Sequence, residues 1–494
     1  MYCGGPGDRE SRMKTLRWGA VGGAALTLSL LGWSRDASAA GFAAQRIGGE
    51  QGGVIATNPT ALYFNPGAMG FTGGGGLGMY TQVALRKVTY DRPAAPSDNM
   101  MGLSGIGNTG RASLFNVFGG PSLGAMARIG NLVVGFGFFA PFYGRAHWDK
   151  NDLSAGDKSQ LAMEPAIIPL VQDGVQRWFP GAIDAELNVY YFTWGAAYRL
   201  GPLSIGGAFN AIYSKLVTTS GSNAQGRALP DTPHEYLAKL DADGIYGSFS
   251  AGAMVEAVPG QVFLGASYQA QPGLSTMQMK GTLTLDGTAT GMSTTPPLPI
   301  SFYESLPDVL RAGVRWRLKD APWELRLLGD WTRWSEFTNQ CITIGPAPCP
   351  IRTDGTEVVS PGTPPQVVQN YRRNWNDTYG VHLGASYWAM PDSEIFAGAW
   401  FETAAVPDST MSPDLTDATS LTGALGFRYQ ASAGLYLTIS YSHWQFVDRN
   451  NIGKSQLAVK NNTPVAIPTK TEDGGGIYKQ WIGQAQANVE ALFP

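Results

Sequence analysis

Arginines on two neighbouring predicted strands are the first residues whose spacing suggests chemistry. Arg311, Arg315 and Arg317 alternate with apolar side chains and so share one face of their strand, and Arg326 faces the same way on the next strand. A guanidinium group binds a carboxylate through paired, charge-assisted hydrogen bonds. These arginines therefore either bind the carboxylate of a ligand or form a bracing lattice of ion pairs with acidic neighbours such as Glu324.

The sequence gives no indication of a catalytic, metal or phosphate site. None of the histidines His147, His234, His382 and His443 neighbours a recognisable nucleophile motif. The run of glycines that begins at Gly73 lacks the lysine and the helix that complete a phosphate-binding loop. We therefore expect no enzyme activity, no metal and no cofactor.

The cysteine content indicates one disulfide in an oxidising compartment. Cys341 and Cys349 enclose seven residues of a Pro- and Gly-rich stretch, whereas Cys3 lies near the amino terminus. A metal site would need further soft or imidazole ligands close by, and this stretch offers none. We expect a Cys341–Cys349 disulfide that pins a surface loop, with two free thiols as the alternative.

Residues 1–39 carry a signal for export. Lys14 and Arg17 precede an apolar stretch, and the small-residue site Ala37-Ser38-Ala39 follows it. The stretch is shorter than the roughly 20 residues that a transmembrane helix needs. We expect an upstream extension and a secretory signal peptide, with cleavage after Ala39.

The composition favours membrane-spanning strands and argues against a nucleic-acid partner. Of 494 residues, 44% are hydrophobic, 15% are charged and 64 are glycine. The formal net charge is −3, which does not favour nucleic-acid binding, and the aromatic content of 11% excludes disorder. Beyond the signal, no apolar run reaches the length of a spanning helix. Low charge with abundant glycine and aromatic residues is typical of a transmembrane β-barrel.

Fourteen segments alternate apolar and polar residues, as a strand with two different faces requires. Short and long connections alternate along the chain. Nothing in the architecture of a soluble β-sandwich would sort its loops in this way. This order matches the periplasmic turns and extracellular loops of an outer-membrane barrel. We predict an all-β fold, a transmembrane antiparallel barrel of 14 strands within residues 75–494. The predicted strands are 75–90, 121–129, 131–140, 187–200, 203–218, 244–257, 261–273, 307–318, 323–334, 374–388, 393–402, 420–430, 434–446 and 478–493.

Both ends of this barrel carry further signals. The last strand alternates and ends in Phe493, the pattern that the outer-membrane insertion machinery recognises, although Pro494 follows. Residues 40–74 are too polar and too rich in glycine for a strand, and they contain Asn-Pro pairs, which initiate turns. We expect residues 40–74 to form a small plug, or hatch, before the barrel.

These features resemble the FadL family of outer-membrane long-chain fatty-acid and hydrocarbon transporters. Asn65-Pro66-Gly67 occupies the position of the family's Asn-Pro-Ala hatch motif, with Gly67 in place of alanine. The resemblance covers most of residues 40–446, and it implies that Phe42, Asn65, Pro66 and Gly67 belong to the hatch and its gating. Further stretches similar to family signatures are Ala40-Gly41-Phe42, Ser305-Leu306-Pro307-Asp308, Asp330–Phe337, Trp375–Tyr379 and Val406-Pro407-Asp408.

The resemblance implies passive uptake of a hydrophobic compound. An extracellular lipophilic groove captures the compound, a lumenal pocket holds it, the hatch shifts, and an inward kink in one strand opens a lateral exit. Gly135 and Gly137 would permit such a kink in the third strand. The loop 141–186 contains the apolar residues Ile168, Leu170, Trp178 and Phe179. These residues either form the groove or pack in an ordinary loop helix.

We therefore expect an outer-membrane transporter for hydrophobic small molecules such as fatty acids or hydrocarbons. Its other partners are the lipid and lipopolysaccharide of a Gram-negative outer membrane and the insertion machinery. We expect a monomer without a nucleic-acid partner. The alternatives are a general porin, which the hatch disfavours, a structural or adhesive barrel, and, less strongly, an outer-membrane lipase.

Overall fold

The structure is a computed structural model that describes residues 47–93, 99–100, 103–104, 110–148, 182–223, 235–287 and 293–493. All of them belong to the unit Asp36–Pro494. The residues that the sequence analysis assigned to the signal and its cleavage site, Phe42, and the loop residues Ile168, Leu170, Trp178 and Phe179 lie outside the described ranges. Within those ranges, no helix is long and apolar enough to cross a membrane.

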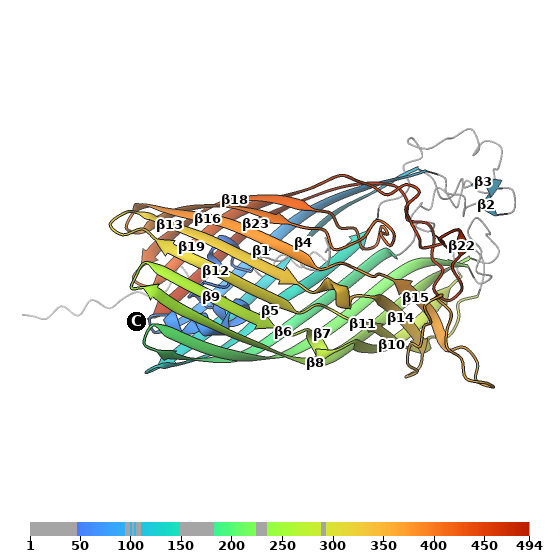
Figure 1. The fold of residues 1–494 in the computed structure, drawn as a ribbon, viewed down its shortest axis with the longest axis horizontal. Coiled ribbons are helices and arrows are strands. Elements are labelled where there is room, and N and C mark those ends of the chain that lie inside the picture. Colours follow the sequence, from blue (N-terminus) through green and yellow to red (C-terminus); the bar gives the residue numbers. More distant parts are fainter. Residues whose placement is uncertain are drawn as a thin grey trace, which may run out of the picture. The chain divides into compact units, whose positions relative to one another are not determined.

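In the described part of the chain, fourteen antiparallel strands close into a ring (Figure 1). Each strand pairs with the next one of the ring, and β23 closes the circle by pairing with β1 from Gly75↔Phe493 to Asp91↔Ile477. Each of the fourteen predicted strands corresponds to one of them, which confirms the predicted fold class. The ring strands are β1 (Gly75–Arg92), β4 (Gly110–Ile129), β5 (Leu132–His147), β6 (Ala182–Leu200), β7 (Leu203–Asn223), β8 (Glu235–Val258), β9 (Val262–Gln269), β12 (Val309–Arg317), β13 (Trp323–Thr332), β16 (Thr378–Met390), β17 (Ser393–Glu402), β18 (Ser420–Ser432), β19 (Leu435–Phe446) and β23 (Ile477–Phe493).

The two faces of each strand follow the alternation of the sequence. On β18, Leu421 and Leu425 point outward and are 63% and 62% exposed, whereas Thr422 is buried on the lumenal side. On β8, the outward positions change from Ile245, which is 78% exposed, to the charged Asp243 and Asp241. Since lipid favours apolar side chains, this change marks the end of the lipid-facing band on the loop side.

The short turns lie at the end of the ring that also holds the carboxyl terminus (Figure 1). Gly201 and Gly260 make two of these turns with φ angles of 59° and 68°. Glycine takes up such left-handed backbone without the steric cost of a Cβ atom. The ends of the ring therefore differ as predicted, with tight turns at one and long connections at the other.

Four neighbouring ring strands continue beyond an interruption, in segments that the sequence analysis treated as loops. β9 continues as β10 (Met277–Asp286), β12 is preceded by β11 (Leu298–Glu304), β13 continues as β14 (Asn339–Ile344), and β16 is preceded by β15 (Val367–Arg372). They pair in the order β8–β10–β11–β14–β15, so they extend the wall on the loop side. The alternation in these strands is short, and each depends on partners distant in sequence, so local pattern did not reveal them.

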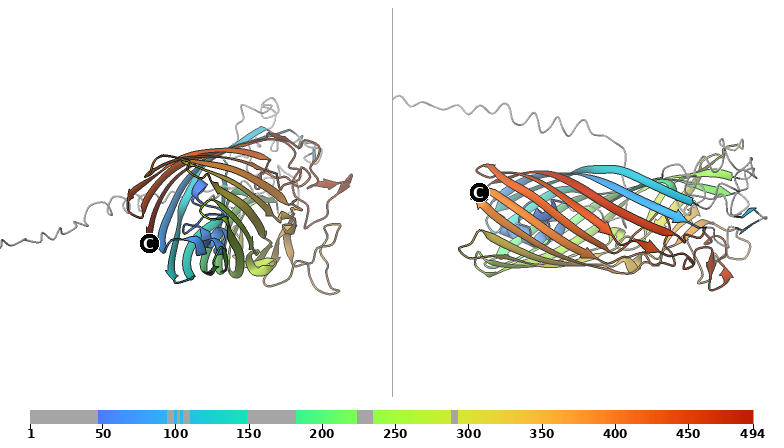
Figure 2. Two further views of the ribbon diagram at one scale, coloured as in Figure 1. Left: turned by 60° about the vertical axis from the view of Figure 1, so that its left-hand side comes forward. Right: turned by 90° about the horizontal axis from the view of Figure 1, so that it is seen from above.

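Residues 47–74, called the N-terminal segment below, lie inside the ring, where Figure 2 shows their helices in blue. They form no strand, as predicted, and Leu62 and Met69 are fully buried. The remaining short elements are η1 (Gly49–Gln51), α2 (Ala61–Phe64), η2 (Pro66–Phe71), η7 (Pro272–Leu274), η9 (Trp334–Glu336), β2 (Asn99–Met100), β3 (Leu103–Ser104), β20 (Arg449–Asn450), β21 (Val459–Lys460) and β22 (Thr463–Pro464).

Candidate functional site

Asn65 attaches the N-terminal segment to the barrel wall. Its side chain accepts a hydrogen bond from the Gly67 amide (3.0 Å) and donates to the carbonyls of Val54 (2.7 Å) and Ala253 (3.0 Å). The barrel wall has room only for glycine at this point, because a Cβ atom added to Gly252 would lie 2.1 Å from Asn65 Oδ1. One added to Gly206 of β7 would lie 2.6 Å from the backbone carbon of Pro66. The Asn65-Pro66-Gly67 motif therefore docks directly on the backbone of β7 and β8.

A lattice of charges ties the same segment to other strands. Arg326 donates to Glu324 Oε1 (3.1 Å), lies 3.4 Å from Glu394 Oε1, and also bonds to Ser386 Oγ and to the carbonyl oxygen of Glu50. Arg326 is thus held by protein groups from several elements, as the bracing alternative requires.

The lattice continues across β18 and β23. Arg428 pairs with Glu490 (2.6 Å), and Asn58 of the N-terminal segment donates to the same carboxylate (2.5 Å). Glu50 lies 3.0 Å from His382 Nε2. A polar cavity of about 330 Å³, called the inner pocket below, lies between the segment and these strands, with Arg315, Arg317, Arg326 and Arg428 among its lining residues.

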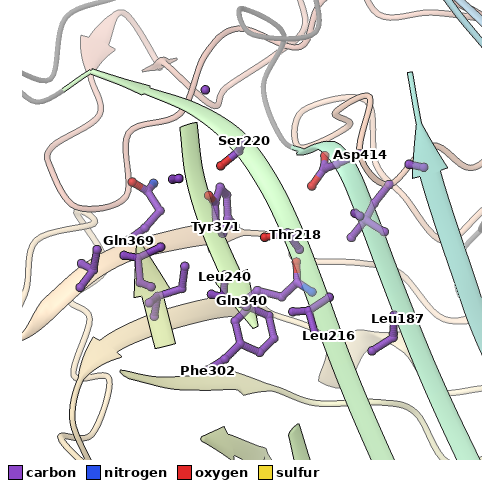
Figure 3. A pocket seen from close by; sticks show the side chains of 18 of the residues that line it. Leu187, Leu216, Thr218, Ser220, Leu240, Phe302, Gln340, Gln369, Tyr371 and Asp414 are labelled. Carbon is purple, nitrogen blue, oxygen red and sulfur yellow. The ribbon is translucent and has the colours of Figure 1, made fainter. Parts of the chain in front are cut away.

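A larger cavity of about 510 Å³, the outer pocket, lies on the loop side, between β6, β7 and β8 and the added strands β10, β11, β14 and β15. Figure 3 shows Ser220, Tyr371 and Asp414 toward one end of it, and Leu216 and Phe302 toward the other. The apolar side chains that dominate its lining include Leu187, Leu216, Leu240, Leu283, Leu298 and Phe302. A concave site with an apolar lining and a few polar groups is the usual form of a small-molecule pocket.

Buried polar side chains form a closed network at the polar end of the outer pocket. Arg373 pairs with Asp414 (2.6 Å), donates to Gln340 Oε1 from two nitrogens (2.9 and 2.7 Å), and donates to Ser412 Oγ (2.9 Å). Gln340 in turn donates to Glu304 Oε2 (2.8 Å). Burial raises the pKa of Glu304 to about 7, against the lowering effects of the Gln340 hydrogen bond and the Arg373 charge.

A third cavity, the middle pocket, measures about 150 Å³ and lies deeper in the lumen. Tyr63 and Phe64 of the N-terminal segment line it, as do Pro141 and Phe142 of β5. Arg311 also lines it, donates to Gln269 Oε1 (3.0 Å), and lies over the Tyr63 ring with 5.4 Å from Cζ to the centroid.

Aromatic rings connect the interrupted strands with the middle pocket. Trp375 and Trp334, in two of the interruptions, have centroids 4.9 Å apart, and Trp334 lies 6.5 Å from Phe142. Tyr191 lies 6.3 Å from Phe142 and 6.1 Å from Tyr63. These distances are those of edge-to-face or offset ring contacts, so the rings form a continuous apolar surface along the lumen.

The wall beside the middle pocket is incomplete. The backbone ladder between β4 and β5 runs from Ile129↔Leu132 to Leu123↔Phe138, although both strands continue within the described residues. Farther toward the loops, the Asn116 side chain of β4 donates a hydrogen bond to the Arg145 carbonyl oxygen of β5 (3.2 Å). The β5–β6 register shifts between Phe139 and Phe142, and Pro141 supplies no N–H group for a ladder.

The strand turns inward at this bulge, since the four residues 139–142 are all buried. The inward turn therefore lies at Ala140-Pro141 rather than at Gly135 or Gly137. Gly135 instead faces the N-terminal segment, where an added Cβ would lie 3.2 Å from Met69.

The other residues singled out in the sequence are dispersed. Arg315 lies over the Phe263 ring at 4.3 Å, away from the outer pocket. Cys341 and Cys349 are joined by a disulfide in the β14 hairpin, with Cα atoms 6.4 Å apart. In the described ranges, no group of three His, Cys, Asp or Glu side chains is placed to hold a metal ion.

Sequence reasoning missed Pro141 and the whole outer pocket. A proline at the end of an otherwise apolar strand indicates a bulge or an edge, so Pro141 could have been noticed. The outer pocket gives no comparable signal, because most of its lining residues lie in segments whose sequence pattern predicts loops.

Comparisons with known proteins agree with this architecture. The family model described as "Outer membrane protein transport protein (OMPP1/FadL/TodX)" matches residues 180–473. No curated protein matches the chain significantly.

Solved structures share the fold at low sequence identity. A Pseudomonas aeruginosa FadL homologue has a TM-score of 0.68 at 16% identity, covering 93% of this chain and 99% of its own. The Ralstonia pickettii toluene transporter TbuX has a TM-score of 0.57 at 14% identity, covering 92% and 98%. The Pseudomonas putida toluene transporter TodX has a TM-score of 0.56 at 15% identity, covering 93% and 99%.

The matched family model spans more than half of the chain and describes proteins of the outer membrane. The closed ring and its apolar outer face agree with that description. The chain therefore belongs to the OMPP1/FadL/TodX family, the outer-membrane β-barrels that transport hydrophobic compounds.

Proposed function

We propose that this protein takes up uncharged or weakly polar hydrophobic compounds through the outer pocket and releases them sideways into the membrane between β4 and β5. The observation that carries this proposal is that the β4–β5 ladder ends beside the middle pocket. The β4–β5 ladder stops at Phe138, and Pro141 and Phe142, just beyond it, line the middle pocket. A compound in the middle pocket is thus next to the unpaired part of the wall.

The energetics of apolar solutes favour this route. Transfer of apolar surface from a pocket to water costs about 25 cal/mol per Å². The rings from Trp375 to Tyr63 offer apolar contact along the lumen. A lateral exit leads from this surface to lipid without passage through water.

We further propose that the N-terminal segment acts as the hatch. Asn65, Pro66 and Gly67 fix it to β7 and β8, and the Arg326 lattice fixes its other part. Polar solutes would have to pass this segment to reach the periplasm, whereas a hydrophobic solute that leaves laterally does not. Toluene is the compound named for two structural relatives, and fatty acids and other hydrocarbons remain candidates for this chain.

Deletion of Pro141 tests the lateral exit. The bulge contains one extra residue, because Phe139 pairs with Tyr191 and Phe142 with Val189. The deletion therefore preserves every other β5–β6 pair and lets the β4–β5 ladder extend. We expect uptake of radiolabelled toluene or oleate into proteoliposomes to fall at least about ten-fold, that is, a barrier ~1.4 kcal/mol higher.

The matched control is Pro141→Ala, which restores an N–H group but keeps the extra residue. We expect this variant to retain most of the uptake. Equal uptake by the deletion variant and the wild type would exclude the lateral exit. Rapid flux of a sugar of similar size through the intact protein would instead support a general porin.

Export and assembly follow the same proposal. We propose that residues 1–39 direct export, that cleavage follows Ala39, and that strand β23 is read by the insertion machinery. Mass spectrometry of the mature protein from outer membranes tests the cleavage, since it should find Ala40 as the first residue.

A further inference from the structure

The positive charges on the outer pocket are already neutralised. Among its described lining residues, the cationic side chains are Arg145 and Arg373. Arg373 is 4% exposed and pairs with Asp414 at 2.6 Å, and Arg145 pairs with Asp184 at 3.2 Å. The other hydrogen bonds of Arg373 go to Gln340 and Ser412, so protein groups already accept hydrogen bonds from its Nε, Nη1 and Nη2 atoms.

An anionic ligand should therefore bind weakly in this pocket. Its charge would lose hydration without gaining a free cation among the described lining residues, and the buried Asp414 carboxylate would repel it. The uncharged polar groups on the lining, such as Thr218, Gln369 and Tyr371, can still offer hydrogen bonds to a neutral ligand.

The size of the pocket gives a second constraint. An apolar cavity of about 150 Å³ is large enough to hold benzene. The outer pocket, at about 510 Å³, is several times larger, whereas the middle pocket, at about 150 Å³, matches one ring or a short segment of a chain.

We propose that the outer pocket selects neutral hydrophobic molecules larger than a monoaromatic hydrocarbon, such as long-chain alcohols or esters, over the corresponding carboxylates, and that Asp414 sets this selectivity by neutralising Arg373. The inference rests on the proposed function, because it names the substrate class of the same transport path. It makes Asp414 a specificity-determining residue rather than a structural one.

The test compares two ligands that differ only in the head group. Binding of tritiated 1-decanol and tritiated decanoate to the full protein in lipid nanodiscs is measured at about pH 6, where a free carboxyl group is ionised and the Glu304 carboxyl of the Arg373 network keeps its proton, with empty nanodiscs subtracted. We expect the wild type to bind decanol at least about ten-fold more tightly than decanoate.

Asp414→Asn keeps the shape of the side chain but frees the charge of Arg373. We expect this variant to bind decanoate at least about ten-fold more tightly than the wild type, with decanol affinity changed less than about three-fold. The double variant D414N/R373Q should return decanoate affinity to the wild-type value. Asp408→Asn is the matched control, because Asp408 pairs with Arg449 outside the outer pocket, and it should change neither affinity.

The outcomes separate this inference from the proposed function. Equal or tighter binding of decanoate by the wild type would overturn the inference while leaving hydrophobic uptake intact. An unchanged decanoate affinity in folded D414N would remove the role of Asp414. If neither ligand binds and neither enters proteoliposomes, the proposed function fails and the inference fails with it.

Discussion

The outer and inner pockets lie on different sides of the N-terminal segment and differ in chemistry. The outer pocket is lined mainly by apolar residues, and the arginines among its described lining residues form ion pairs with aspartates. The inner pocket is lined by four arginines together with Glu50, Glu324 and Glu394. A hydrophobic solute gains free energy in the first and meets a largely polar and charged surface in the second. The segment therefore lies between an apolar cavity and a polar one, and under the proposed function a lumenal exit to the periplasm would suit an apolar cargo poorly.

Substitution of Gly252 by alanine should weaken this separation most. The added Cβ would lie 2.1 Å from Asn65 Oδ1, so the motif cannot dock as it does now. Loss of the three Asn65 hydrogen bonds would cost on the order of 3 kcal/mol. We expect sugar flux into proteoliposomes to rise more than about ten-fold.

Gly207→Ala provides the matched control for that substitution. A Cβ atom at Gly207 would meet only a carbonyl oxygen at 3.6 Å, so the barrel should stay closed to sugars. Equal sugar flux in the two variants would show that the docking of Asn65 does not seal the lumen.

Replacement of Arg326 by methionine should destabilise the part of the protein around the inner pocket. Glu324 and Glu394 would lose a buried partner, and breaking a buried ion pair costs about 3–5 kcal/mol. A lower midpoint of thermal unfolding in detergent checks this effect. Arg352→Met, at an exposed loop position, should leave the midpoint unchanged. A normal midpoint in Arg326→Met would mean that the lattice does not brace the segment.

The buried Glu304, in the network beside the outer pocket, should make the stability of the protein depend on pH. Because burial raises its folded-state pKa from 4.5 to about 7, the folded protein holds a proton that the unfolded chain releases. Stability should therefore fall as pH rises from about 4.5 to about 7, by on the order of 3 kcal/mol, and stay level above that range.

Glu304→Gln should remove this pH dependence. Thermal midpoints of the variant and the wild type at about pH 5 and about pH 8 measure it, with Glu336→Gln as control, because the Glu336 carboxylate is half-exposed and pairs with Arg333. A wild-type midpoint that is the same at both pH values would contradict the prediction.

Truncation of Phe142 should have the smallest effect. Phe142→Ala removes ring contacts with Tyr191 and Trp334, each worth about 1 kcal/mol. We expect uptake of the hydrophobic solute to fall roughly five-fold, with sugar flux unchanged. Phe401→Ala, on the lipid-facing surface, should affect neither. If sugar flux also rose in Phe142→Ala, Phe142 would support the hatch rather than the route of the hydrophobic solute.

The sequence predicted the architecture well because strand faces are local. Each of the fourteen ring strands has a predicted counterpart, and Leu421 and Thr422 point to lipid and lumen as their alternation indicates. The position of the hatch motif at Asn65 was also readable, since turn residues and an apolar patch mark it. The roles of Arg311, Arg315 and Arg326 were left open between ligand binding and bracing.

The functional site was less accessible to the same reasoning. Strands β10, β11, β14 and β15 depend on partners that the sequence pattern does not identify. Pro141 was placed in a loop, and the end of the β4–β5 ladder is a property of two strands together.

The sequence by itself determined the number of ring strands, their lipid-facing sides and the segment that lies inside the ring, because these depend on residues close together in the chain. Only the tertiary structure decided which charges are neutralised and where the wall is unpaired. Arg373 and Asp414 are 41 residues apart, and Arg326 reaches Glu50 across 276 residues. Such pairs form only when the closed ring and its loops bring them together, and their proximity decides whether an arginine binds a ligand or the protein itself.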